Sequence, residues 1–75
     1  MDHQKIYENI ILIAKSKNRQ KLNKNDIDYV YYENHHIIPK CLNGNDDENN
    51  LVLLTAKEHY VCHKLLPDII LIIVN

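Results

Sequence analysis

The chain has 75 residues, of which 45% are hydrophobic and 25% are charged, and its formal net charge is −1. A domain of this length buries only about 60% of the surface that its unfolded chain exposes, so a bound metal or a partner chain is expected to supplement the small core. Two cysteines are too few for a disulfide scaffold, and the near-neutral charge excludes a nucleic-acid interface spread over the whole surface. Any contact with phosphates must therefore be local.

The sequence shows no export or membrane signal. Its first ten residues lack the basic start, apolar stretch and cleavage site of a secretory signal peptide. The longest apolar run, residues 69–74, is far shorter than the roughly 20 residues that cross a bilayer. These features predict a cytoplasmic or nuclear protein that is not secreted and has no membrane span, with Cys41 and Cys62 as free thiols.

The first part of the chain, residues 1–22, is predicted to be an N-terminal helix and a basic linker. Apolar side chains recur at three- and four-residue spacing from Ile6 to Ala14, and Asp2 is a suitable N-cap for an amphipathic helix. Residues 15–25 contain five of the nine Lys and Arg residues and no acid. We interpret this stretch as a solvated helix end and linker, with phosphate contact as the alternative.

The middle of the chain has the pattern of two strands. Residues 26–38 are rich in β-branched and aromatic side chains and lead into Pro39, which predicts a strand that ends near the proline. The Asn-Gly pair at 43–44 and the polar residues after it predict a long connection. The chain then returns antiparallel into a second strand at residues 51–54.

A helix is predicted to follow the second strand. Thr55 and Glu58 have the spacing of a capping box, and the helix should run to about Leu66 because Pro67 is expected to end it. Residues 67–75 are then an atypical apolar tail, which is a buried strand, an interface or the altered end of a truncated gene. The order of helix, strand, strand and helix predicts an α+β fold.

Four histidines have the spacing of a metal site. His59 and His63 lie four residues apart on one face of the predicted helix, where two imidazoles can bind one ion. A catalytic site uses three protein ligands and one open position, and either His35 or His36 completes the set. Adjacent strand residues point to opposite faces, so the other strand histidine is free for another role, such as deprotonating a water.

Three segments in order, "HHIIP", "NLVLLT" and "EHYVCH", resemble the HNH endonucleases in residues and spacing. The resemblance covers about residues 5–66 and is greatest to the small HNH enzymes of phages and mobile introns. It implies a ββα-metal (His-Me finger) core over residues 28–66, preceded by the N-terminal amphipathic helix. This implied fold agrees with the strand, loop, strand and helix read from the residues alone.

The resemblance also implies roles for individual residues. It makes three histidines the metal ligands: His35, His59 and His63. His36 becomes the general base that activates water. Asn50, before the leucine of "NLVLLT", becomes the residue that orients the loop and His36, with Asn49 as the second candidate.

The implied activity is metal-dependent hydrolysis of DNA phosphodiester bonds, with double-stranded DNA as the expected partner. The ligand nitrogens suit zinc or nickel, whereas the family is also associated with magnesium and manganese, so the identity of the divalent ion stays open. The oligomeric state and the target sequence also stay open. The alternative function is a catalytically inactive or truncated remnant that is stabilised by metal and binds nucleic acid.

Several other residues have two interpretations. Cys62 lies three residues after His59 and is either a fourth ligand or, as we favour, a buried apolar side chain. The acids at 46–48 are favoured as a solvent-facing turn over a cation site. The tyrosines at 29, 31 and 32 are favoured as a packing face of the strands over a base-stacking surface. Glu33 is a candidate acceptor for the ring N–H of a metal-binding histidine.

Overall fold

The computed structural model describes the backbone of residues 2–74 and the side chains of residues 2–70. It is a small α+β fold, as predicted. The elements in chain order are helix α1 (His3–Ser16), strand β1 (Glu33–His36), two short 3-10 turns (Lys40–Leu42 and Glu48–Asn50), strand β2 (Leu51–Leu54) and helix α2 (Ala56–Val74). The strands form an antiparallel pair in which His36 lies opposite Leu51 and Glu33 lies opposite Leu54.

Helix α1 begins at the predicted N-cap. The carboxylate of Asp2 accepts a hydrogen bond from the backbone N–H of Lys5 at 3.1 Å, which satisfies one of the free donors of the first turn. Tyr7, Ile11 and Ala14 lie on one face of the helix and are buried. Their spacing of three and four residues is the reason why one stripe of α1 can be covered completely by the rest of the fold.

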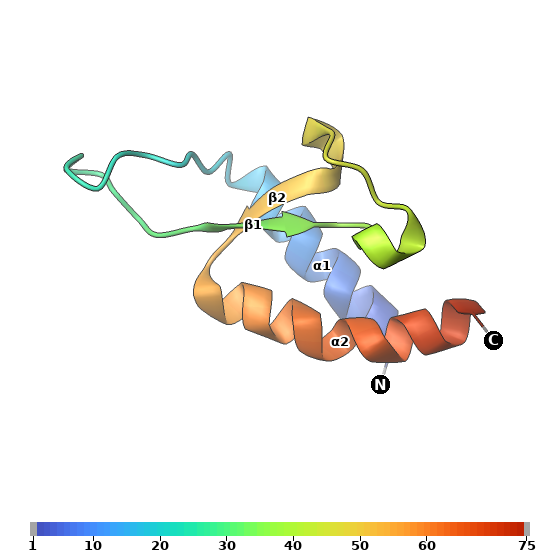
Figure 1. Ribbon diagram of the computed structural model, residues 1–75. Helices are drawn as coiled ribbons and strands as arrows, with labels where there is room; N and C mark the ends of the chain where they lie inside the picture. The colour runs from blue at the N-terminus through green and yellow to red at the C-terminus, as the bar shows by residue number, and fades with distance from the viewer. Residues whose placement is uncertain (1, 75) are drawn as a thin grey trace.

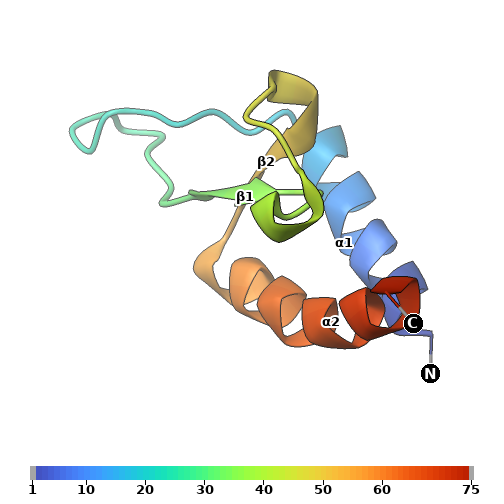
Figure 2. The same ribbon diagram turned by 45° about the vertical axis from the view of Figure 1, so that its right-hand side comes forward.

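The core lies between the two helices and the inner face of the sheet. Its buried members come from α1 (Tyr7, Ile11, Ala14), β2 (Val52, Leu54) and α2 (Cys62, Leu66, Ile69). Figures 1 and 2 show α1 and α2 crossing beside the two strands. The start of α1 lies against the C-terminal half of α2, where His3 contacts Asp68. Each strand has alternating burial, so its outer side chains stay accessible.

The start of α2 is fixed by two interactions. The predicted capping box forms, because Thr55 Oγ1 accepts from the N–H of Glu58 and Glu58 Oε1 accepts from the N–H of Thr55. Arg19 also donates to both carboxylate oxygens of Glu58, at 2.7 and 3.2 Å, and to the carbonyl of Leu53. The Arg19 side chain is only 8% exposed. For Arg19, therefore, the interpretation as part of a solvated linker is wrong.

The expectation that Pro67 ends the helix is also wrong, since α2 continues through Pro67 to Val74. Proline inside a helix costs about 3 kcal/mol, because its nitrogen cannot donate to the carbonyl four residues earlier. On the two sides of Pro67, Leu66 and Ile69 are buried in the core, and each such burial contributes about 1.5–3 kcal/mol. Packing of the longer helix therefore outweighs the lost hydrogen bond. The atypical tail at residues 67–74 is helical rather than a strand, and the side chains of residues 71–75 lie outside the described part.

Strand β1 is shorter than the predicted segment at 26–38. Strand β2 has only four residues, so the backbone before Glu33 has no partner with which to pair. Residues 23–29 instead form consecutive turns, in which the side chains of Asn23 and Asp26 accept from backbone N–H groups two residues later. The segment from residue 18 to residue 32 is therefore a long excursion away from the sheet, as Figure 1 shows.

The Asn-Gly pair makes the turn that the sequence predicts. Asn43 has a φ of 67° and ends the first 3-10 turn. Gly44 donates its N–H to the carbonyl of Pro39 at 2.9 Å. A Cβ atom at position 44 would lie 1.7 Å from the carbonyl oxygen of Ile38, so only glycine fits this close backbone contact. Within residues 2–74, no helix has the length and apolar character that crossing a membrane requires.

Candidate metal centre

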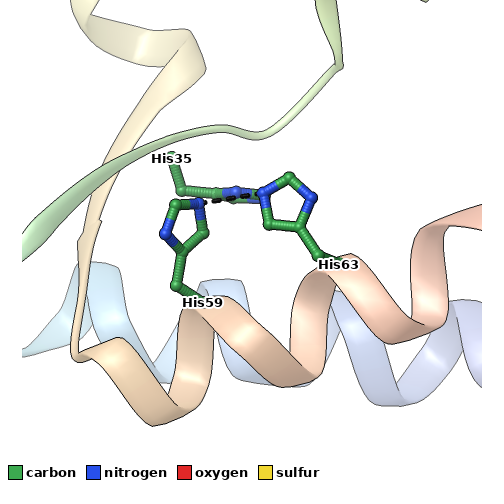
Figure 3. Close-up of side chains that lie close together, drawn as sticks. All are labelled: His35, His59 and His63. Atoms are coloured by element: carbon green, nitrogen blue, oxygen red, sulfur yellow. Dashed lines mark hydrogen bonds between the residues drawn. The ribbon is translucent and has the colours of Figure 1, made fainter.

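Three histidines from two elements meet beside the core. His35 comes from β1, and His59 and His63 come from successive turns of α2 (Figure 3). One ring nitrogen from each lies within 4.8 Å of the other two. The Nε2 atoms of His59 and His63 are 3.0 Å apart. The ring centroid of His35 lies 5.1 Å from that of His59 and 5.5 Å from that of His63.

The ring of His35 is fixed by a hydrogen bond with Tyr7 of α1. The Tyr7 hydroxyl donates to the carbonyl of Ile37 at 2.7 Å, and the same oxygen lies 2.7 Å from Nε2 of His35. A hydroxyl has one proton, so toward His35 the oxygen accepts and Nε2 carries the hydrogen. Nδ1 of His35 then keeps its lone pair. Burial, followed by the neighbouring His59, lowers the pKa of His35 to about 4, so the ring is neutral at pH 7.

His59 is oriented by a carboxylate. Its Nδ1 lies 2.8 Å from Oε1 of Glu33, the first residue of β1. The other oxygen of Glu33 accepts from the Tyr31 hydroxyl at 2.5 Å. The hydrogen bond from Tyr31, followed by that from His59, lowers the pKa of Glu33, so the carboxylate is ionised and only accepts. Nδ1 of His59 therefore carries the hydrogen, and Nε2 has the free lone pair. This is the acceptor role for which Glu33 was a candidate.

These three residues fit a divalent cation. Metal-binding histidines normally donate their second N–H to a carboxylate or another oxygen, and His35 and His59 both do so. The Nε2 atoms of His59 and His63 face each other at 3.0 Å, a separation at which one cation can contact both nitrogens. The site opens into a pocket of about 300 Å³ that His36 and Lys40 also line. Three nitrogen donors beside an open pocket leave room for water or substrate.

Cys62 is not part of this cluster. Among the described residues, only His35, His59 and His63 converge as possible ligands. The Cys62 side chain is completely buried in the core, and burial raises the pKa of its thiol to about 11. The favoured interpretation of Cys62 as a buried apolar side chain is confirmed.

His36, the neighbour of His35 on β1, is not part of the three-histidine cluster but lines the same pocket. His35 is buried with Val52, whereas His36 is half-buried and lies opposite Leu51. Nε2 of His36 lies 2.7 Å from Oδ1 of Asp46, and the ammonium of Lys40 lies 3.4 Å from the same oxygen. The hydrogen bond with His36, followed by the contacts with Lys40, lowers the pKa of Asp46. The ionised carboxylate can only accept, so Nε2 of His36 carries a hydrogen.

Asn50 fastens the loop that carries Asp46. Its Oδ1 accepts from the N–H of Ile38 at 2.9 Å, and its Nδ2 donates to the carbonyl of Asn45 at 2.7 Å. The backbone oxygen of Asn50 accepts from the N–H of Ile37, next to His36. Asn50 is buried, whereas Asn49 is exposed. Of the two candidate asparagines, therefore, Asn50 is the one that joins both ends of the loop.

The sequence interpretation missed two residues at this site. Asp46 was expected to be a solvent-facing turn residue, and it is exposed, but its carboxylate also contacts His36. The sequence does not indicate the pairing of His36 with Asp46, because Asp46 lies in a polar loop ten residues after the histidine. Tyr7 lies within the apolar stripe predicted for residues 6–14, and this spacing alone gives it no role at a metal site. A buried tyrosine hydroxyl needs a hydrogen-bond partner, and this requirement was the available signal.

Comparison with known proteins finds relatives in Enterobacteria phage T4. Probable mobile endonuclease D of Enterobacteria phage T4 is 54% identical over 69 residues, which are 92% of this chain and 25% of the relative. Probable mobile endonuclease E of the same phage is 45% identical over 69 residues, 92% of this chain and 43% of the relative. Probable mobile endonuclease B is 48% identical over 66 residues, 88% of this chain and 24% of the relative.

The chain is thus homologous, over most of its length, to proteins named as mobile endonucleases of phage T4. It spans between about a quarter and two fifths of the length of these relatives. No family model matches the chain. No solved structure matches it either.

Proposed function

We propose that the chain is a metal-dependent endonuclease of the HNH type, built on a ββα-metal core, which hydrolyses phosphodiester bonds of double-stranded DNA. The observation that supports this proposal most directly is the convergence of His35, His59 and His63 within 4.8 Å. A further histidine with a carboxylate partner lines the same pocket. Similarity to probable mobile endonucleases supports DNA as the substrate.

In this proposal His35, His59 and His63 hold the divalent ion. The bound ion supplies a Lewis acid that stabilises negative charge on the phosphate and on the departing 3′ oxygen. Magnesium, manganese, nickel and zinc are all candidates, and three imidazole ligands suit nickel and zinc best. Tyr7 and Glu33 keep the rings of His35 and His59 in the tautomers that present a lone pair.

His36 is the proposed general base. In the neutral ring, Nε2 carries the hydrogen that Asp46 accepts, so Nδ1 has the lone pair that can take a proton from water. When the ring becomes an imidazolium, the Asp46 carboxylate at 2.7 Å stabilises its positive charge. Lys40 lines the pocket of the histidines and lies beside Asp46, so its ammonium can neutralise a phosphate oxygen.

Asn50 is proposed as a positioning residue. Its side chain makes three hydrogen bonds to backbone groups of Ile38 and Asn45. These bonds fix the loop between His36 and Asp46, so that the imidazole and its carboxylate partner stay in register. Loss of the amide is expected to lower cleavage through disorder of this loop rather than through loss of metal binding.

The decisive experiment is conversion of supercoiled plasmid by the purified protein, with magnesium, manganese, nickel or zinc added separately. His36→Ala is the catalytic variant, and His3→Ala is the matched control because His3 contacts Asp68 away from the pocket. The proposal predicts cleavage by the parent protein and by His3→Ala, and none by His36→Ala. If no protein cuts with any ion while zinc still stabilises the fold, the chain is a metal-stabilised remnant and the catalytic proposal is wrong.

A further inference from the structure

A second groove begins at the edge of the histidine cluster. It lies between the two limbs of the excursion at residues 18–32, and it is about 610 Å³ in volume. Lys21 and Lys24 line it on the outgoing limb, and Tyr29 and Tyr31 line it on the returning limb. His59 lines both this groove and the pocket of the histidine cluster, so the groove adjoins the candidate metal centre. Figures 1 and 2 show the excursion projecting from the same end of the sheet in both views.

The cations of this groove are free to bind a ligand. The stretch at residues 15–25 contains five of the nine basic residues of a chain whose net charge is −1. Arg19 forms an ion pair with Glu58, and Lys15 donates a hydrogen bond to the carbonyl of Asn49. Within the described residues, neither Lys21 nor Lys24 forms an ion pair with a carboxylate. Of the five basic residues of this stretch, Lys21 and Lys24 therefore bring positive charge without a paired carboxylate into the groove, whereas Lys17 lies outside its lining.

The tyrosines of the groove differ in availability. The ring of Tyr32 is covered by the Arg19 guanidinium, whose carbon lies 5.0 Å from the ring centroid. Tyr31 is 55% exposed, although its hydroxyl is fixed by Glu33. Its anchor holds the ring in place beside the lysines while the ring itself stays uncovered. These tyrosines lie outside the strands, since β1 begins only at Glu33, so they do not form the packing face that the sequence suggested.

We propose that this groove binds an unpaired strand of DNA next to the cleavage site, with phosphates on Lys21 and Lys24 and a base stacked on Tyr31. The proposal deepens the proposed function, on which it rests for the identity of the ligand as nucleic acid. Fixed aromatic rings beside lysines are the combination that binds single strands, because every base has a face that can stack. In a duplex those faces are covered by neighbouring bases, so the exposed ring would add nothing to duplex binding.

The position of Tyr31 gives the groove a link to the metal centre. Tyr31 donates to Glu33, and Glu33 accepts from His59. A nucleotide stacked on Tyr31 is therefore connected to the candidate metal ligand His59 through two hydrogen bonds, both of which Glu33 accepts. The groove then serves to hold nucleotides that flank the cleaved phosphate, where the duplex is locally opened.

The test measures binding of the full chain to fluorescein-labelled oligothymidylate by fluorescence anisotropy. The protein contains His36→Ala, and chelator replaces divalent ions, so that binding is separated from cleavage. The groove variants are Tyr31→Ala and the double variant Lys21→Ala with Lys24→Ala. Tyr31→Phe keeps the ring but loses its contact with Glu33. Tyr60→Ala and Lys57→Ala are the matched controls, because both side chains are exposed on α2 and outside the groove.

Tyr31→Ala is expected to weaken binding at least about fivefold, as loss of one stacked base does. The lysine variant is expected to reduce the slope of log affinity against log salt by about 1.4, which corresponds to two lost phosphate contacts on a single strand. Tyr31→Phe, which keeps the stacking ring but loses its anchor, should weaken binding less than Tyr31→Ala, and the two controls should bind like the parent protein. The proposal is wrong if both groove variants bind like the parent, or if the parent prefers a duplex of the same sequence over the single strand. Plasmid cleavage without groove binding would overturn this inference alone, and groove binding without cleavage would overturn the proposed nuclease alone.

Discussion

Replacing Tyr7 with phenylalanine removes one oxygen atom that joins helix α1 to the candidate metal centre. That oxygen makes two hydrogen bonds of 2.7 Å, one with Nε2 of His35 and one with the carbonyl of Ile37. His35 is buried, so its N–H is left without a partner, at a cost of about 1–3 kcal/mol. Ile37 is only half-buried, and water can partly replace its lost bond. We therefore expect the metal-free variant to lose about 2 kcal/mol of unfolding free energy.

The same substitution is expected to weaken metal binding. Loss of an outer hydrogen bond to a ligating histidine typically lowers metal affinity 10- to 100-fold, because the ring and its tautomer are no longer fixed. Urea unfolding of the metal-free protein measures the first effect, and zinc titration against a chromophoric chelator measures the second. Tyr60→Phe is the matched control, since Tyr60 is 64% exposed and lies outside the pocket of the histidines.

The two measurements separate a positioning role from simple packing. A Tyr7→Phe protein that loses stability but binds zinc as tightly as the parent would show that the hydroxyl serves only the core. A variant with unchanged stability and unchanged zinc affinity would refute the inferred tautomer of His35. Only loss of zinc affinity beyond that of Tyr60→Phe agrees with a hydroxyl that positions the His35 ring for the metal.

Other contacts give three more predictions. Glu33→Gln should weaken zinc binding about tenfold, since a neutral amide holds the N–H of His59 less strongly than the carboxylate at 2.8 Å, and the same chelator competition measures it. Arg19→Met should cost about 1–2 kcal/mol of unfolding free energy at pH 7, because the Glu58 side chain is 28% exposed and its ion pair is partly screened. The hydrogen bond from Arg19 lowers the pKa of Glu58 to about 2, so this stabilisation is present above about pH 4.5 and is lost as the pH falls toward 2. Urea unfolding across this range should show the unfolding free energies of the parent and Arg19→Met becoming equal at low pH. A difference that stays constant with pH would contradict the assignment. Gly44→Ala should destabilise the protein by about 1–3 kcal/mol, because its Cβ would overlap the carbonyl of Ile38, and a melting temperature equal to that of the parent would be inconsistent with this contact.

Much of the fold can be predicted from local patterns. The N-cap at Asp2, the capping box of Thr55 and Glu58, and the two antiparallel strands all depend on residues close together in sequence. The four-residue spacing of His59 and His63 likewise predicts that they share one helix face. These features need no knowledge of tertiary packing, and the structure contains each of them.

The rest depends on contacts between distant segments. Pro67 has the local character of a helix end, and only the burial of Leu66 and Ile69 against α1 explains why the helix continues. The pairing of Arg19 with Glu58 spans 39 residues, and the hydrogen bond of Tyr7 with His35 spans 28. A sequence pattern gives the chemistry of such groups but not their partners, because many polar residues of suitable type compete for each one.

The central claim is that three histidines hold one divalent ion, and its most direct test is the stoichiometry and spectrum of Co²⁺ binding. Cobalt reports nitrogen ligands and their geometry through its visible absorption bands. We predict one Co²⁺ per chain, loss of the spectrum in His63→Ala, and an unchanged spectrum in His36→Ala, because His36 is not among the three converging histidines. Binding that survives in His63→Ala, or that is lost in His36→Ala, would contradict this assignment of ligands.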